Sequence, residues 1–255
     1  MVKAGIFLAA ITTFASAPFA LVNDADNAAA RLKPIAFQSD LAWRQFPLPA
    51  VSLSKTTKIN HFAWQEIDNK VIEQISYNVA RLLYKDMESA PKLPTLHIVF
   101  EDLKGVAYKE GDFNGATIHI SANYMENFST SHSETESVDE LIGILYHEIA
   151  HAYQLDDHNY KEIGPIIEGI ADVVRLKAGY IPDDTQKPGG NYRDGYKNTA
   201  FFIDWLSKQS NRDLLQEINA QLDPHDDITW DWQYFEQSAG VKLDTAWQRY
   251  QASLL

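Results

Sequence analysis

The chain contains no cysteine among its 255 residues. This absence excludes disulfide bonds, a thiol nucleophile and a zinc site with cysteine ligands, so any metal ion must be held by His, Asp or Glu side chains. Basic residues are also few, since 22 Lys and Arg face 35 Asp and Glu and give a formal net charge of -13. Because nucleic acids and anionic membranes bind basic surfaces, we expect neither as a partner.

Long hydrophobic runs are missing as well, apart from a short one at the N-terminus. The first residues, MVKAGIFLAAITTFASAPFA, place Lys3 before an apolar run over residues 5–14, and small residues follow. This layout predicts a secretory signal peptide at residues 1–20, with cleavage within residues 17–20. The run is too short and too rich in Thr and Ser to span a bilayer. We therefore expect a secreted protein, extracellular or periplasmic, whose mature form does not contact a membrane.

The chain after the predicted signal peptide is long and apolar enough to form one folded domain. Apolar residues make up 45% of the chain, which is sufficient for a buried core. Residues 21–50 are interrupted by Pro34, Pro47 and Pro49 and read as an irregular leader. We expect residues 51–255 to form a single domain, with the leader either retained or removed as a pro-segment.

Hydrophobic periodicity predicts an α+β fold in which a small mixed sheet precedes a helical C-terminal half. A Ser-x-x-Glu capping box at Ser137 and Glu140 marks the start of a central helix that continues through HEIAH,. The other predicted helices cover residues 64–87, 165–178, 195–208, 212–222, 230–238 and 243–252, and the predicted strands cover 94–102, 105–111 and 115–124.

The motif HEIAH at residues 147–151 carries the chemistry. Residues four apart on a helix differ by about 40° in angle and about 6 Å along the axis, so His147 and His151 can bind one zinc ion. Glu148 lies about 100° around the helix from His147, beside the metal, where it can take a proton from water. The alternative is a pair of ordinary histidines on a helix surface.

A catalytic zinc ion needs a third protein ligand, and three candidates follow the motif. Glu168 lies on the next predicted helix, where IIEGIADVV is otherwise almost entirely apolar, while Asp157 and His158 lie closer in sequence. We favour Glu168, because buried carboxylates need a partner. Asp172 lies four residues further along the same helix and is predicted to accept the second ring N–H of a metal-bound histidine.

Other residues complete a possible hydrolytic site. Tyr196 opens a predicted helix after a glycine-rich loop and is the first choice as donor to a tetrahedral oxyanion, with Tyr192 and Arg193 as runners-up. The strand GATIHIS, at residues 115–121, is expected to offer an open edge for an extended peptide. The aromatic run ITWDWQYFEQ is interpreted as packing rather than as a carbohydrate-binding surface.

The run of motifs resembles a known family. HExxH followed by EGxAD is similar to the glutamate-liganded, thermolysin-like zinc peptidases, and YHEIAHAYQ, IIEGIADVVRLKAGY, KPGG and DGYKNTAFFIDWL resemble the plant basic secretory protein family over about residues 57–250. The resemblance implies a zincin-like metallopeptidase acting on peptides or proteins, with His147, His151 and Glu168 on Zn²⁺ and Glu148 as base. The acidity of this chain departs from the family name. A catalytically silent zinc-binding or ligand-binding protein and a hydrolase of another amide or ester are the competing interpretations.

Overall fold

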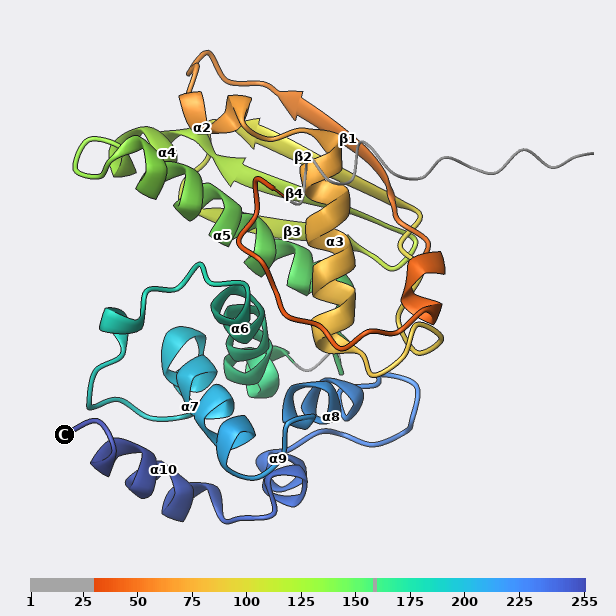
Figure 1. Cartoon of the computed structure of the whole chain (residues 1–255), viewed down its shortest axis with the longest axis vertical. Helices are drawn as coiled ribbons and strands as arrows, with labels where there is room; N and C mark the ends of the chain where they lie inside the picture. The colour runs from red at the N-terminus through yellow and green to blue at the C-terminus, as the bar shows by residue number, and fades with distance from the viewer. Residues whose placement is uncertain (1–29, 158–159) are drawn as a thin grey trace, which may run out of the picture.

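The computed structural model describes residues 30–157 and 160–255, which are arranged in two halves (Figure 1). The first half holds a four-stranded sheet with helices against it, and the second half is helical. This is the mixed architecture expected of an α+β fold. The predicted signal peptide at residues 1–20 lies outside the described residues.

The sheet has the strand order β1-β2-β4-β3. Strands β1 (Ala50–Lys55), β2 (Thr95–Glu101) and β4 (Gly115–Ser121) run parallel, and β3 (Ala107–Asp112) pairs antiparallel with β4. Strand β1 was not predicted from the sequence, and its first residue, Ala50, falls within the expected leader. The expectation that residues 115–121 form an open edge was wrong, because β4 is paired on both sides and the edge strands of the sheet are β1 and β3.

One face of the sheet is apolar and the other is polar, as the register shows. Leu96, Ile98 and Phe100 of β2 are aligned with Ala116, Ile118 and Ile120 of β4, and all six side chains are buried. Helices α3 (Asn69–Leu83) and α5 (Glu134–Tyr153) cover this face (Figure 1). The apolar face therefore forms the floor on which α5, the helix that carries HEIAH, is fixed.

Helix α5 begins one turn earlier than the sequence analysis expected. Ser133 is the N-cap residue, and its side chain and that of Glu136 form the reciprocal capping box. The hydroxyl of Ser137 donates to the carbonyl of Ser133, and Glu140 accepts hydrogen bonds elsewhere. The predicted cap at Ser137 and Glu140 was therefore wrong.

Other boundaries also moved. The single helix predicted for residues 64–87 is divided into α2 (Phe62–Gln65) and α3, and Asp68 caps the start of α3 by accepting from the backbone N–H of Val71. The strand predicted for residues 115–124 ends at Ser121, whose hydroxyl caps the unforeseen α4 (Ala122–Phe128).

The second half consists of helices that pack on one another. The described elements are α6 (Tyr160–Lys177), α7 (Tyr196–Gln209), α8 (Leu214–Ala220), α9 (Trp232–Ala239) and α10 (Leu243–Ala252), with short 3-10 turns at Ala42–Gln45 and Asp183–Thr185 elsewhere. Helix α7 packs on α6, and the last helix, α10, returns to pack on α7. Helix α6 contains Pro165, where a sequence reading places the helix start. Gly169 lets α6 and α7 approach closely, since a Cβ atom there would overlap Cγ2 of Thr199.

The aromatic residues of the second half pack against one another. Trp230 and Phe235 are buried, and the ring of Trp232 contacts those of Trp230, Phe235 and Tyr192. This arrangement supports the packing interpretation of the run ITWDWQYFEQ.

The described part of the leader is integrated into the fold. Trp43 and Phe46 are buried in the core. Lys33 donates to Asp139 of α5 and to the carbonyl of Gly179, which follows α6. The leader thus connects the two halves of the molecule.

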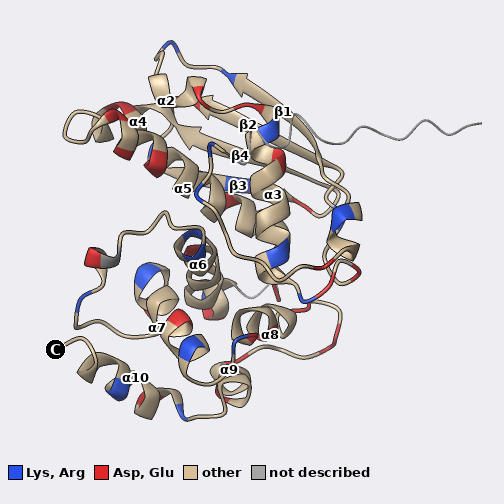
Figure 2. Cartoon of the chain, in the orientation of Figure 1, with Lys and Arg blue, Asp and Glu red and all other residues tan. Residues whose placement is uncertain are grey.

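Charged residues of both signs are interspersed over the two halves (Figure 2). Within residues 30–157 and 160–255, every helix is too short or too polar to cross a membrane.

Candidate metal centre

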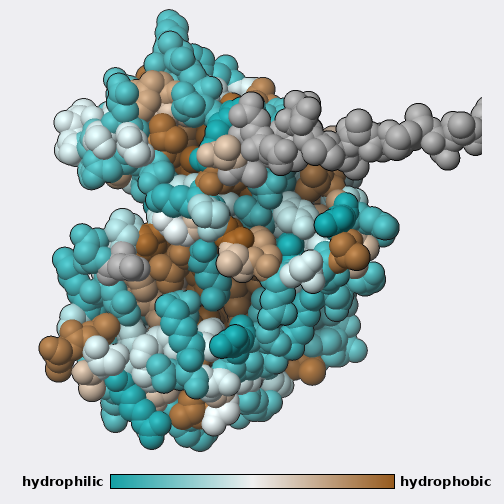
Figure 3. Space-filling model, in the orientation of Figure 1, coloured by the Kyte–Doolittle hydropathy of each residue, from teal (hydrophilic) through white to brown (hydrophobic). Residues whose placement is uncertain are grey.

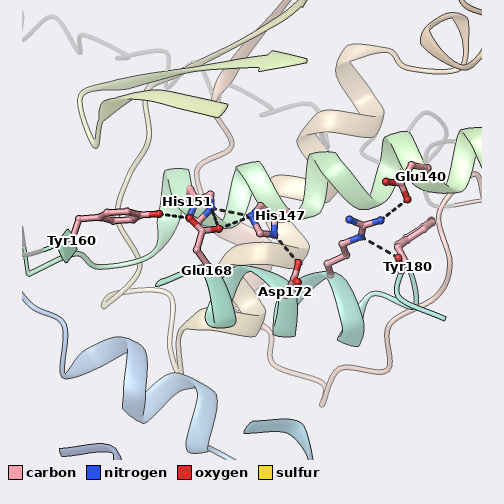
Figure 4. Close-up of polar contacts among 8 residues, drawn as sticks. Glu140, His147, His151, Tyr160, Glu168, Asp172 and Tyr180 are labelled. Atoms are coloured by element: carbon pink, nitrogen blue, oxygen red, sulfur yellow. Dashed lines mark hydrogen bonds and ion pairs between the residues drawn. The ribbon is translucent and has the colours of Figure 1, made fainter. Parts of the chain in front are cut away.

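The centre lies where α5 and α6 pack antiparallel. His151 faces Glu168, and one helical turn away His147 faces Asp172 (Figure 4). Helix α5 is held by the apolar sheet on one side, so its remaining face meets α6 with polar side chains. The structure therefore brings together four residues that the sequence analysis singled out from two separate motifs.

Three of these residues direct one ligand atom each towards a common point. Nε2 of His147 lies 3.1 Å from Nε2 of His151 and 3.2 Å from Oε2 of Glu168, and the third side of the triangle, from His151 Nε2 to Glu168 Oε2, is 3.5 Å. Ligands about 2.0–2.1 Å from a tetrahedral zinc ion are separated by about 3.3 Å. Within the described residues this is the cluster that could hold a metal ion, and its dimensions fit zinc.

Asp172 orients one of the two histidines. Its Oδ1 lies 2.8 Å from Nδ1 of His147, and the carboxylate is buried. Burial lowers the pKa of His147, but the hydrogen bonds with Asp172 and Glu168 outweigh burial and raise it to about 9. A carboxylate on Nδ1 leaves Nε2 directed at the metal position, which is the usual arrangement behind a metal-binding histidine.

The pKa of Glu168 moves in the opposite direction. Burial would raise it, but the hydrogen bonds with His147 and His151 hold the pKa of this carboxyl well below its usual range. Glu168 is therefore an anion at neutral pH, as a metal ligand must be.

Glu148 lies in the same region but outside the ligand triangle. Its side chain is buried, and the charges of His151, His147 and Lys109 of β3 act on it. Burial raises the pKa of Glu148, while these positive groups oppose the rise. A carboxyl whose pKa is raised towards neutrality is suited to exchange protons with water.

Two tyrosines flank Glu168, and the sequence analysis found only one of them. The hydroxyl of Tyr160 donates to Oε1 of Glu168 over 2.6 Å. The ring of Tyr196 lies parallel to that of His147, with 6.1 Å between centroids, and its phenol is exposed. Burial and the carboxylate of Glu168 raise the pKa of Tyr196, so the phenol keeps its proton and can donate.

The runners-up for the donor role lie away from the metal centre. The hydroxyl of Tyr192 donates to Asp244 in a buried site. Arg193 lies over the rings of Tyr192 and Trp232. Neither residue belongs to the surface that surrounds the two histidines.

The three candidates for the third metal ligand differ in where they lie in the structure. Asp157 accepts a hydrogen bond from the backbone N–H of Trp230 over 2.7 Å, which commits one of its oxygens to the loop before α9. His158 lies outside the described residues. Glu168 is the candidate that the structure places beside both histidines.

A second polar group continues the α5–α6 interface beyond Asp172. Arg175 donates to Glu140 over 2.6 Å and to the carbonyl of Tyr180, and Tyr124 donates to the other oxygen of Glu140. The side chain of Arg175 passes Gly143, where a Cβ atom would lie 2.7 Å from its Nε. This network fixes the spacing of the two helices and, with it, the distance between the histidines and Glu168.

The candidate metal centre opens into a large cleft between the two halves, and the surface is hollowed between them in Figure 3. The cleft has a volume of about 1500 Å³, which exceeds the roughly 300–1,000 Å³ of a small-molecule pocket. Strand β3 forms one wall, and the start of α7 with Tyr196 forms another. None of the described leader residues, 30–50, lines the cleft.

Most of the described chain matches the model of a known protein family. A family model described as BSP, peptidase of plants and bacteria, matches residues 53–250. No curated protein and no solved structure matches the chain. The matched range contains strands β2, β4 and β3, the second half of β1, the residues that line the cleft and every residue of the candidate metal centre.

Proposed function

The chain belongs to the family of peptidases of plants and bacteria, the basic secretory protein family, and from this premise we propose that it is a secreted, zinc-dependent endopeptidase with a zincin-like fold. The observation that carries the proposal is the triangle of His147, His151 and Glu168, with sides of 3.1, 3.2 and 3.5 Å. A peptidase family implies a peptide or protein substrate, and the cleft is large enough for a polymer.

In the proposed reaction His147, His151 and Glu168 hold the zinc ion, and Asp172 fixes the ring of His147. Zinc, when bound, supplies a Lewis acid that activates water and polarises the scissile carbonyl. Glu148 accepts a proton from the attacking water and then passes it to the leaving amine, which its raised pKa favours,. The phenol of Tyr196 donates to the developing oxyanion.

The open edge of β3 is the proposed platform for the substrate backbone. Residues 107–109 of this strand line the same cleft as the metal ligands, and β3 pairs with β4 on one side only. An extended peptide can add to such an edge through backbone hydrogen bonds. A structure with a bound peptide tests this proposal, which fails if the peptide lies elsewhere in the cleft.

Export remains part of the proposal. It rests on the predicted signal peptide at residues 1–20 and on a mature domain that starts with the leader. Sequencing the N-terminus of the exported protein tests both points, because retention of residues 30–50 is expected from the burial of Trp43 and Phe46.

The decisive experiment compares the purified mature protein with its Glu148→Gln variant. Both are expected to bind about one zinc ion per chain, as a single three-ligand site requires, while only the wild type cuts a protein substrate. If both bind zinc and neither cuts peptides, a silent binding protein or a hydrolase of another amide or ester replaces the proposal. If neither binds zinc, the metal centre itself is refuted.

A further inference from the structure

Tyr160 contacts the metal-facing carboxylate of Glu168 from the side opposite the histidines (Figure 4). Oε2 of Glu168 lies 3.2 and 3.5 Å from Nε2 of His147 and of His151. Oε1 accepts the hydrogen bond of Tyr160 over 2.6 Å. The two oxygens of one carboxylate therefore have different partners, one towards the metal position and one towards a phenol.

The local helix explains how Tyr160 reaches a residue eight positions away. Tyr160, Gly164 and Glu168 follow one another at intervals of four on α6, which places them in one stripe of the helix surface. The rise between Tyr160 and Glu168 is about 12 Å. Side chains on a helix lean towards its N-terminus, so Glu168 leans towards Tyr160. The ring of Tyr160, at the first turn, points the other way, past Gly164, and spans the remaining distance.

Gly164 provides the space that the ring needs. A Cβ atom at this position would lie 3.4 Å from Cε1 of the Tyr160 ring, so a methyl group would just touch the ring and a larger side chain would displace it. Across this glycine the ring carries its hydroxyl to within 2.6 Å of Oε1, to which it donates.

We propose that Tyr160 is a positioning residue that holds Glu168 as a one-oxygen metal ligand. This inference rests on the proposed zinc site. A carboxylate can bind a metal through one oxygen or through both, and a catalytic zinc site needs its fourth position free for water. By occupying Oε1, Tyr160 prevents the second oxygen from turning into that position.

Removing the donor has two expected effects that do not depend on catalysis. Partners behind a metal ligand typically contribute 10–100-fold to metal affinity, so Tyr160→Phe is expected to weaken zinc binding by about that factor. The freed Oε1 is also expected to join the coordination of the metal and raise its coordination number.

The test uses Co²⁺, whose visible absorption is intense when it has four ligands and weak when it has more. Wild type, Tyr160→Phe and a control, Tyr108→Phe, are loaded with Co²⁺, and zinc affinity is measured separately by chelator competition. Tyr108 is a suitable control, because it is an exposed tyrosine that lines the same cleft on β3. Gly164→Leu serves as a second variant, since its side chain would displace the ring while leaving Tyr160 in the chain.

The inference predicts weak absorption in Tyr160→Phe and Gly164→Leu, and intense absorption in wild type and Tyr108→Phe. An unchanged spectrum in Tyr160→Phe would overturn it, even if the affinity for zinc fell, because Tyr160 would then only stabilise α6. If wild type takes up neither Co²⁺ nor zinc, the proposed function fails and the positioning role fails with it. Wild-type binding with unchanged variants refutes the positioning role alone.

Discussion

The hydrogen bond between Asp172 and His147 makes a quantitative prediction about zinc affinity as a function of pH. Zinc needs the neutral imidazole, whereas the 2.8 Å contact with Asp172 contributes to raising the pKa of His147 to about 9 in the metal-free protein. At about pH 7 the ring is then roughly 99% protonated, and this proton weakens the apparent affinity for zinc by about 100-fold. Affinity in the wild type should therefore rise by about tenfold per pH unit between about pH 7 and pH 9.

The substitution Asp172→Asn changes both the pKa of His147 and the strength of His147 as a zinc ligand. Without the carboxylate, one of the two hydrogen bonds that raise the pKa of His147 is lost while burial still lowers it, so the proton competes less and affinity depends less steeply on pH above about 7. The neutral ring is also a poorer ligand, by a typical 10–100-fold. The two proteins should differ by that full factor near pH 9, and the difference should shrink towards pH 7.

Chelator competition at a series of pH values measures both curves. Asp204→Asn is a matched control, because Asp204 is also a buried aspartate but pairs with Lys177 and Lys208. A wild-type affinity that does not change with pH, or an equal slope in Asp172→Asn, would refute the reasoning.

The same pKa has a consequence for the metal-free fold. Because the folded pKa of His147 lies above its ordinary value of 6.5, its contribution to stability is complete below about pH 6.5 and is lost as the pH rises through about 9.

Two further predictions concern the cleft and the leader. Tyr196→Phe should reduce kcat by about 10²–10³-fold with little change in KM or zinc content, as expected for loss of an oxyanion donor, and an unchanged kcat in steady-state assays would remove Tyr196 from the mechanism. Deleting residues 21–48 removes the buried side chains of Trp43 and Phe46. This deletion should lower the free energy of unfolding by at least about 3 kcal/mol. A denaturant midpoint equal to that of the intact mature protein would instead identify the leader as a removable segment.

Much of the metal centre could be predicted from sequence because helical geometry is local. The spacing of His147 and His151 is set by the 3.6-residue repeat, and the carboxylates of Glu168 and Asp172 stood out in an apolar helix. In the structure these four side chains lie close together, as their positions on two helices predicted. Whether they bind zinc is what the Glu148→Gln comparison decides.

Tyr160 was missed for a local reason. Pro165 favours the first turn of a helix, so the predicted helix began there and Tyr160 fell outside it. In the structure α6 begins at Tyr160, so Pro165 lies inside the helix. Because proline has no backbone N–H, the hydrogen bond to the carbonyl of Lys161 is lost. The glycine four residues from both Tyr160 and Glu168 was the available signal.

Other errors came from ambiguity and from long-range pairing. The Ser-x-x-Glu signature occurs twice, at Ser133 and at Ser137, and the second serine is buried and bonds back to the first. The open edge was placed on β4 instead of β3, because strand order depends on contacts between distant segments that no local pattern records,.

The open edge of β3 also affects how copies of the protein behave towards one another. An edge that can accept a substrate strand can equally accept the same strand of a second molecule, which is a route to self-association. Here Lys109, Glu110 and Asp112 place charges along the strand, and Gly111 has a φ of +91° that interrupts a flat extended edge. Together with a net charge of -13, which repels other copies, these residues oppose pairing of the edge with a second molecule while leaving it available to a peptide.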